Sequence, residues 1–161
     1  MASNRHLGRV IVLQSLYEFD FRENAGDSSA DLDEILSRNL ERYEKKIDDK
    51  DFVKTLAKSV SANSRQLDAL LQPVAPQWPI SQIATMDREV LRMAAYELGS
   101  KQTPPKVVIN EAVELAKSFG ADNSSRFING VLGTLYRQMS ESSETQSEEK
   151  TDEQSEQPTE K

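Results

Sequence analysis

Apolar residues recur along most of this chain at the three- and four-residue spacing that gives an α-helix one hydrophobic face. The pattern is clearest between Pro104 and Tyr136, where two such faces follow each other and a short polar corner lies between them. No segment shows the alternation of apolar and polar residues that is typical of a β-strand. The pattern therefore predicts an all-α protein of about seven helices, over residues 4–22, 31–46, 52–71, 80–83, 86–98, 104–119 and 123–136.

Glycines and short polar residues mark the ends of the last two predicted helices. Gly120 is expected to end the first of them in a left-handed conformation, which glycine adopts without steric cost. Asp122 or Asn123 then caps the next helix by accepting its free N–H groups. Gly130 and Gly133 fall inside that helix, where each glycine costs about 1 kcal/mol relative to alanine. We expect another backbone to approach these two glycines closely in compensation.

Three prolines between residues 73 and 79 interrupt the helical pattern. Because proline lacks an N–H group and clashes with the preceding helical turn, this density of prolines excludes a regular helix. We place the joint between two small helical bundles here, with subdomains at about residues 1–72 and 80–139. Trp78 lies within the joint. It is interpreted as a packing anchor rather than a base-stacking platform, because large aromatic side chains commonly fill cores.

The charge of the chain is concentrated at its C-terminal end. Residues 140–161 contain no aliphatic or aromatic side chain, so they cannot bury enough surface to offset the entropy of ordering. Their eight acidic residues and two lysines account for all but −1 of the formal net charge of −7. The sequence thus predicts a disordered acidic tail over residues 140–161. The nearly neutral remainder, residues 1–139, is open to an anionic partner.

Composition excludes several classes of function. The chain has no cysteine, which excludes disulfides and thiolate metal sites. No apolar run has the length of a membrane span and the first residues lack the order of a signal peptide, so we expect a cytoplasmic protein. His6, the one histidine, has no serine or acidic partner at a recognisable spacing, and no glycine-rich phosphate-binding loop is present. We therefore expect no enzymatic activity, no cofactor and no metal.

Basic residues at the start of the first helix point to a binding function. Arg5, His6 and Arg9 precede the first acidic residue of that helix, Glu18. Cations there oppose the helix dipole, which favours negative charge at an N-terminus. Either they are ordinary solvated side chains or they bind an anion. Further candidates lie at helix ends and on polar faces: Arg88, Arg92, Lys117, Asn123, Ser124, Ser125 and Arg126. Tyr17 and Phe127 either belong to the core or stack on bases. The composition indicates a small helical binding module.

One long string carries a family resemblance. VINEAVELAKSFGADNSSRFINGVL, residues 108–132, resembles the C-terminal hallmark of the bacterial transcription antitermination factor family NusB. The first helix, with Arg5, Arg9 and the Leu13-Gln14-x-Leu16-Tyr17 run, and the Met86–Leu98 segment are similar to the first and fifth helices of that family. The resemblance covers nearly all of residues 4–139. His6, Leu7 and Gly8 occupy a stretch that is often richer in arginine, and the acidic tail lies outside the family pattern.

The resemblance implies an all-helical fold and a function in transcription. Family members bind the boxA element of nascent RNA together with the ribosomal protein NusE, join RNA polymerase in an antitermination complex and support transcription of ribosomal RNA operons. It further implies an RNA-binding surface made of Arg5, His6, Arg9, Tyr17, Asp87, Arg88, Arg92, Asn123, Ser124, Ser125, Arg126 and Phe127. The acidic tail is expected to be dispensable for RNA binding or mildly inhibitory.

Two other functions stay open at this point. The same helical fold resembles the N-terminal domain of ribosomal RNA cytosine methyltransferases, although no strand-rich cofactor domain follows residue 139. A protein-interaction scaffold, including a homodimer, would also need nothing beyond amphipathic helices.

Overall fold

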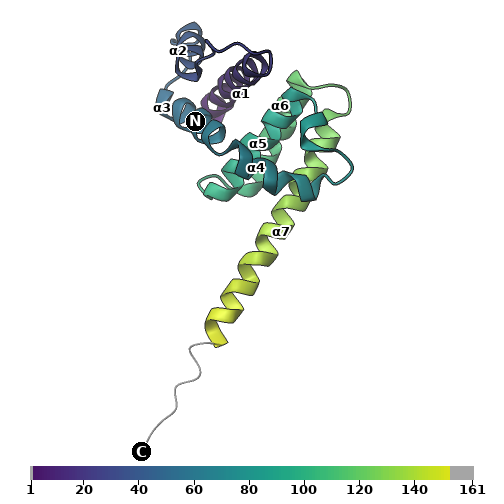
Figure 1. Ribbon diagram of the computed structural model, residues 1–161. Helices are drawn as coiled ribbons and strands as arrows, with labels where there is room; N and C mark the ends of the chain where they lie inside the picture. Colours follow the sequence, from purple (N-terminus) through teal and green to yellow (C-terminus); the bar gives the residue numbers. More distant parts are fainter. Residues whose placement is uncertain (1, 153–161) are drawn as a thin grey trace, which may run out of the picture.

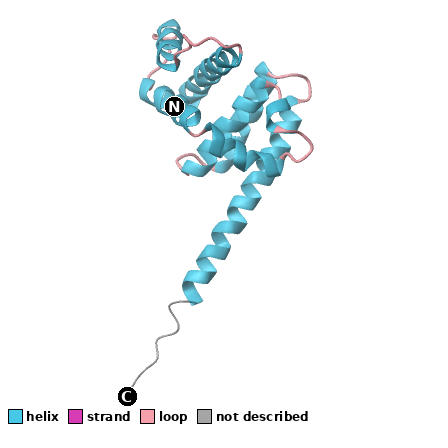
Figure 2. Cartoon of the chain, in the orientation of Figure 1, coloured by secondary structure: helices cyan, strands magenta, loops and turns pink. Residues whose placement is uncertain are grey.

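Every regular element of the protein is helical over residues 2–152, the part that the computed structural model describes, with side chains from Asn4 to Ser147. Figure 2 shows helices joined by loops and no strand in this range. The predicted all-α class is confirmed. The helices are α1 (Ala2–Asn24), α2 (Leu32–Arg42), α3 (Lys50–Ala62), α4 (Ser64–Leu71), α5 (Thr85–Ser100), α6 (Pro105–Phe119) and α7 (Ser124–Asp152), with 3-10 turns η1 (Gln72–Val74) and η2 (Ile80–Gln82).

Local capping explains where several helices begin and end. The Asp31 side chain accepts the Asp33 and Glu34 N–H groups at the start of α2, as expected for an acidic N-cap. The long helix predicted over residues 52–71 is divided at Asn63 into α3 and α4, within the polar stretch Ser61–Gln66 where the sequence also allowed an exposed turn. Asn63 donates its backbone N–H and its side-chain amide to the Ser59 carbonyl, 3.1 and 2.8 Å away. An asparagine that bonds its own backbone in this way competes with the helical ladder.

Helix α5 lies at the centre of the fold. It contacts α1, α3, α4, α6 and α7, and Figure 1 shows α1–α3 grouped on one side of it, with α6 and the first half of α7 on the other. One hydrophobic cluster runs through both groups, and its fully buried members include Ile11, Leu91, Leu115 and Leu132. Helix α4 packs more on α5 than on α3, whereas the subdomain division at residues 72–79 stays a prediction.

Helix α7 continues into the acidic segment that was expected to be disordered. It runs to Asp152 and projects from the rest of the molecule as a single rod (Figure 1). Nucleation is the costly step of helix formation, and the packed residues from Ile128 to Leu135 provide the nucleus, so each added residue needs only its own hydrogen bond. In the structure, residues 140–152 therefore continue α7. Residues 153–161 lie outside the described part of the chain. None of the described helices is long and apolar enough to cross a membrane.

The glycines of the last two helices have a backbone conformation or surroundings that differ from those predicted. Gly120 has an extended backbone, φ −89° and ψ −175°, and is not left-handed. A Cβ atom there would lie 2.6 Å from the Ser124 Cβ and 2.8 Å from the Ala116 carbonyl oxygen. Gly120 is therefore needed because no side chain fits. Gly130 and Gly133 have no neighbouring atom within 4 Å of such a Cβ, so the predicted close approach of another backbone is wrong.

Alanine substitutions should separate these two kinds of glycine. Gly120→Ala should lower the free energy of unfolding by about 1–3 kcal/mol, since the corner must shift to admit the methyl group. Gly130→Ala should raise it by up to about 1 kcal/mol, because alanine is the better helix former and meets nothing. Urea denaturation of both variants measures the difference. Equal stabilities would contradict the steric role of Gly120.

Candidate nucleic-acid interface

Three of the arginines predicted to bind RNA are enclosed within the protein. Arg9 is 4% exposed and donates from Nε and Nη2 to the two carboxylate oxygens of Glu97, 2.9 and 2.8 Å away. This pair joins the first part of α1 to the second half of α5. Arginine and carboxylate make paired hydrogen bonds of this kind because their planar groups match. In this structure, Arg9 is therefore a link between helices and is not accessible to RNA.

The other two arginines belong to a charged network at the opposite end of α5. Arg88 donates to Asp20 of α1 at 2.6 Å. Arg92 donates to both oxygens of Asp68 on α4, at 2.7 Å each, and to Glu89 at 2.8 Å. Arg88 is 8% exposed. Their positive charges are thus paired with carboxylates within the fold, and their side chains are only 10% and 12% exposed.

Burial changes the acidity of one member of this network. Glu89 is 2% exposed, and loss of hydration raises the pKa of its carboxyl to about 7, with Arg92 opposing the rise and Asp20 adding to it. Loss of hydration penalises the charged form of a carboxyl group. The charge of the network therefore changes near neutral pH.

Arg5 and His6 remain accessible at the start of α1. The guanidinium carbon of Arg5 lies 4.1 Å from the ring centroid of Phe52, and His6 Nδ1 lies 2.7 Å from Glu111 of α6. Gly8 makes room for the aromatic ring, since a Cβ atom there would come within 3.3 Å of it. The arginine is held over the ring by a cation–π contact while about half of its side chain is exposed. The role of Phe52 has no signal in the sequence, where it fits an ordinary apolar stripe.

The α6–α7 corner presents the second accessible group. Ser124 itself is buried: its hydroxyl accepts the Ala121 N–H at 2.9 Å and donates to Asp87 of α5 at 3.0 Å. Asn123 and Arg126 are exposed, and Ser125 and Phe127 are half-buried. The Asp87–Ser124 bond brings two predicted site residues together. Asp87 and Glu97 are ten positions apart on α5, roughly 15 Å at the rise of an α-helix, so the corner and the α1 start lie toward opposite ends of that helix.

Some aromatic side chains lie in environments other than those predicted for them. Tyr17 is half-buried and stacks on Phe21 with ring centroids 6.3 Å apart, and Phe21 is 60% exposed. Trp78 is 54% exposed, so its interpretation as a packing anchor is wrong. Helical spacing could not identify these exposed rings, because an apolar residue at the edge of a broad hydrophobic face has the same spacing as a buried one. No group of three potential metal-ligating side chains occurs in the described part of the chain.

Known proteins are similar to this chain in both sequence and fold. The family model described as the NusB family matches residues 6–137. Transcription antitermination protein NusB of Chloroflexus aggregans is 42% identical over 138 residues, covering 84% of this chain and 88% of that protein. The protein of the same name from Roseiflexus castenholzii is 40% identical over 146 residues, covering 87% and 99%. The similarity therefore extends over nearly the whole of these relatives.

Solved structures agree with the sequence comparison. T. maritima NusB superposes with a TM-score of 0.73 at 31% identity, over 83% of this chain and 90% of that one. The structure of antitermination factors NusB and NusE in complex with dsRNA shares the fold, with a TM-score of 0.73 at 22% identity and coverages of 85% and 98%. The family match includes α1, α5 and the α6–α7 corner, the elements that carry the accessible groups. The chain therefore belongs to the NusB family of transcription antitermination proteins.

Proposed function

We propose that this protein is an antitermination factor that binds boxA-type RNA together with NusE and acts within the RNA polymerase complex on ribosomal RNA operons. The observation that carries the proposal is the family match over residues 6–137, supported by relatives covered nearly end to end. A solved structure with the same fold contains NusB, NusE and dsRNA. The protein acts by binding rather than by catalysis, in the cytoplasm, where bacterial RNA is transcribed.

The accessible residues define the RNA surface in this proposal. Phosphates are contacted by Arg5 and Arg126, both exposed, because exposed guanidinium groups pair with phosphate oxygens. Polar and aromatic contacts come from His6, Asn123, Ser125, Phe127 and Tyr17. The enclosed Arg9, Arg88 and Arg92 act indirectly by holding α1 and α4 against α5. Asp87 contributes by fixing Ser124 and with it the corner.

Loss of both exposed arginines should weaken RNA binding in a salt-dependent way. Fluorescence anisotropy would measure the affinity for a labelled boxA-type RNA, with and without NusE, at several salt concentrations. Arg5→Ala/Arg126→Ala should lower the affinity and reduce the slope of log affinity against log salt by about 0.7 for each lost contact with a single strand.

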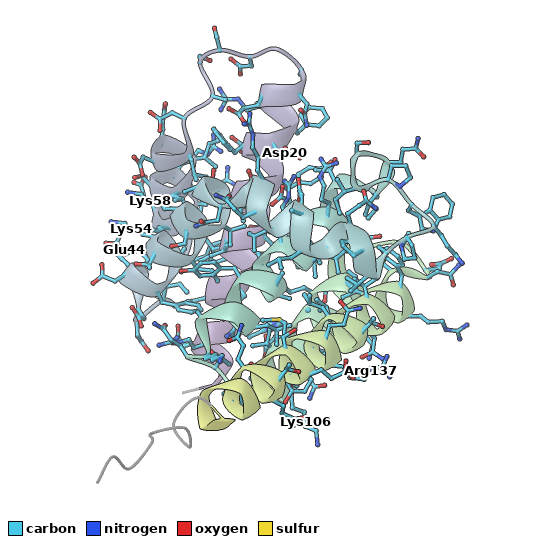
Figure 3. The ribbon with its side chains drawn as sticks, turned by 60° about the horizontal axis from the view of Figure 1, so that its bottom comes forward. Asp20, Glu44, Lys54, Lys58, Lys106 and Arg137 are labelled. Carbon is cyan, nitrogen blue, oxygen red and sulfur yellow. The ribbon has the colours of Figure 1, made fainter. Side chains whose placement is uncertain are left out.

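A matched control removes the same charge elsewhere. Lys58 of α3 and Arg137 of α7 are labelled on other parts of the molecule in Figure 3 and are both exposed. Lys58→Ala/Arg137→Ala should leave the slope nearly unchanged. Equal losses in the two double variants would contradict the proposed surface. A wild-type protein that binds no boxA-type RNA even with NusE would contradict the proposed function itself.

A further inference from the structure

A small pocket lies between the loop before α5 and the α6–α7 corner. Its volume is about 320 Å³, and its lining includes Trp78 and Gln82 from the loop, Asp87 from α5, and Asn123 and Phe127 from the corner. This volume is at the lower end of the range for small-molecule sites, roughly 300–1,000 Å³. In Figure 1 the two loops that form it lie next to each other, on the side of α5 and α6 away from α2 and α3. With Ser124, which also lines it, the pocket combines two aromatic side chains with four polar ones.

The exposed tryptophan is held on a fixed loop. Gln72 donates from its side-chain amide to the Trp78 carbonyl at 2.9 Å and accepts the Ile80 N–H at 2.9 Å. The Trp78 N–H in turn donates to the Ala75 carbonyl at 3.2 Å. The backbone on both sides of the indole is thus anchored although the side chain is 54% exposed. Because the backbone that carries the ring is already ordered, less entropy is lost when a second flat ring stacks on it.

The opposite wall is also fixed before any ligand arrives. The Ser124 hydroxyl bonds both to the Ala121 N–H and to Asp87 Oδ2, which holds the start of α7 against α5. Phe127 is half-buried and packs against the hydrophobic cluster. Asp87 Oδ1 makes no hydrogen bond to any of the residues that the structure describes. A free carboxylate oxygen accepts hydrogen bonds and so favours a ligand that carries N–H donors.

We propose that this pocket binds one unpaired nucleobase of RNA, stacked on Trp78, with its amino edge toward Asp87 and Asn123. Proteins recognise single-stranded RNA by stacking splayed bases on aromatic rings and bonding their edges. The exposed guanidinium of Arg126, one residue from Phe127, supplies a cation for the adjoining phosphate. The carboxylate favours adenine, cytosine or guanine over uracil, since uracil has no exocyclic amino group. The inference deepens the proposed function and rests on it.

Trp78 is the only tryptophan of the chain, so its own fluorescence reports on the pocket. Single-stranded boxA-type RNA added to the full chain should quench this fluorescence, because a stacked base deactivates the excited indole. The titration is repeated with NusE present, and the signal of the Trp78→Phe variant is subtracted. RNA that binds with unchanged Trp78 fluorescence would overturn the proposal.

Affinity measurements then locate the base. Trp78→Ala should weaken RNA binding about tenfold, the order expected for loss of one stacked base, while Trp78→Phe keeps most of the affinity. Tyr136→Ala, which removes another exposed aromatic ring, serves as the control and should bind like the wild type. Circular dichroism should show all three variants folded, since both residues lie at the surface, with exposures of 54% and 41%.

Abasic sites placed one at a time along the RNA test whether a single base occupies the pocket. One position should weaken binding to the wild type and have no further effect with Trp78→Ala, and uracil at that position should also weaken binding to the wild type. If no position behaves in this way, the proposal that the pocket binds a base is overturned. The proposed function still stands in that case, provided that the wild type binds the RNA. Loss of NusE binding by Trp78→Ala without loss of RNA affinity would instead identify a protein-docking site and overturn the inference.

Discussion

Replacing Arg9 by alanine is expected to lower the free energy of unfolding by about 3–5 kcal/mol. The substitution leaves Glu97, which is 6% exposed, without the guanidinium that now bonds both of its oxygens. An unpaired charge in the interior costs far more than the pair itself contributes. Urea denaturation of the variant and the wild type under identical conditions measures the change.

Two control variants make this result specific. Arg5→Ala removes an exposed arginine from the same helix and should change stability by less than about 0.5 kcal/mol. Arg9→Met/Glu97→Leu removes both charges and should recover most of the loss, because apolar groups of similar size replace a buried pair well. If Arg9→Ala were as stable as Arg5→Ala but bound RNA weakly, we would conclude that Arg9 contacts RNA directly.

The stability of the protein should fall as the pH rises from about 4.5 to about 7, because of Glu89. Its carboxyl has a folded-state pKa of about 7 against an ordinary value of 4.5, so in this interval the folded state binds more protons than the unfolded one. Such a difference makes the free energy of unfolding decrease with pH. The shift corresponds to roughly 3 kcal/mol once the pH is above both pKa values. Urea denaturation at pH 5 and pH 8 measures it.

The variant Glu89→Gln should lose most of this dependence and be more stable than the wild type at pH 8. The amide stays neutral while Arg92 keeps both oxygens of Asp68. Asp27→Asn is the contrasting control. Hydrogen bonds from Ser29 and then Arg22 lower the pKa of Asp27 to about 2, so its contribution is lost only as the pH falls below about 4. Wild-type stability that is flat between pH 5 and pH 8 would contradict the buried charge of Glu89.

The environments of Arg9, Arg88 and Arg92 could not be predicted from the sequence. Helical spacing states which residues share a face of their own helix, but not what the facing helix presents. The partners Glu97, Asp20 and Asp68 lie 88, 68 and 24 positions away along the chain. Only packing of α1 and α4 on α5 brings those carboxylates to the arginines. Arg5 and Arg126 stay exposed, and the carboxylate that Arg5 meets, Asp49 at 3.5 Å, is itself about half exposed.

Helix positions depended much less on distant contacts. Periodicity, proline and capping residues are local, and they located α1, α2, α5, α6 and the start of α7 from the sequence. Differences in helix bounds arose where local signals compete: Asn63 divides one apolar stripe into two helices, and the packed part of α7 extends a helix into residues with no apolar side chain. Gly120 was correctly singled out, but its reason is the proximity of Ser124 and Ala116, which backbone preference alone does not reveal.

By itself, the sequence determined the helical class, most helix boundaries and the family, because these depend on local periodicity and on one long string of residues. Tertiary structure alone decided which charges are neutralised and which aromatic rings face solvent. Burial and ion pairing arise between segments that are distant in the chain, so no spacing along it encodes them. The α6–α7 corner is the clearest case. Its residues could be identified from the sequence, but the pocket that they form with Trp78 exists only when the chain is folded.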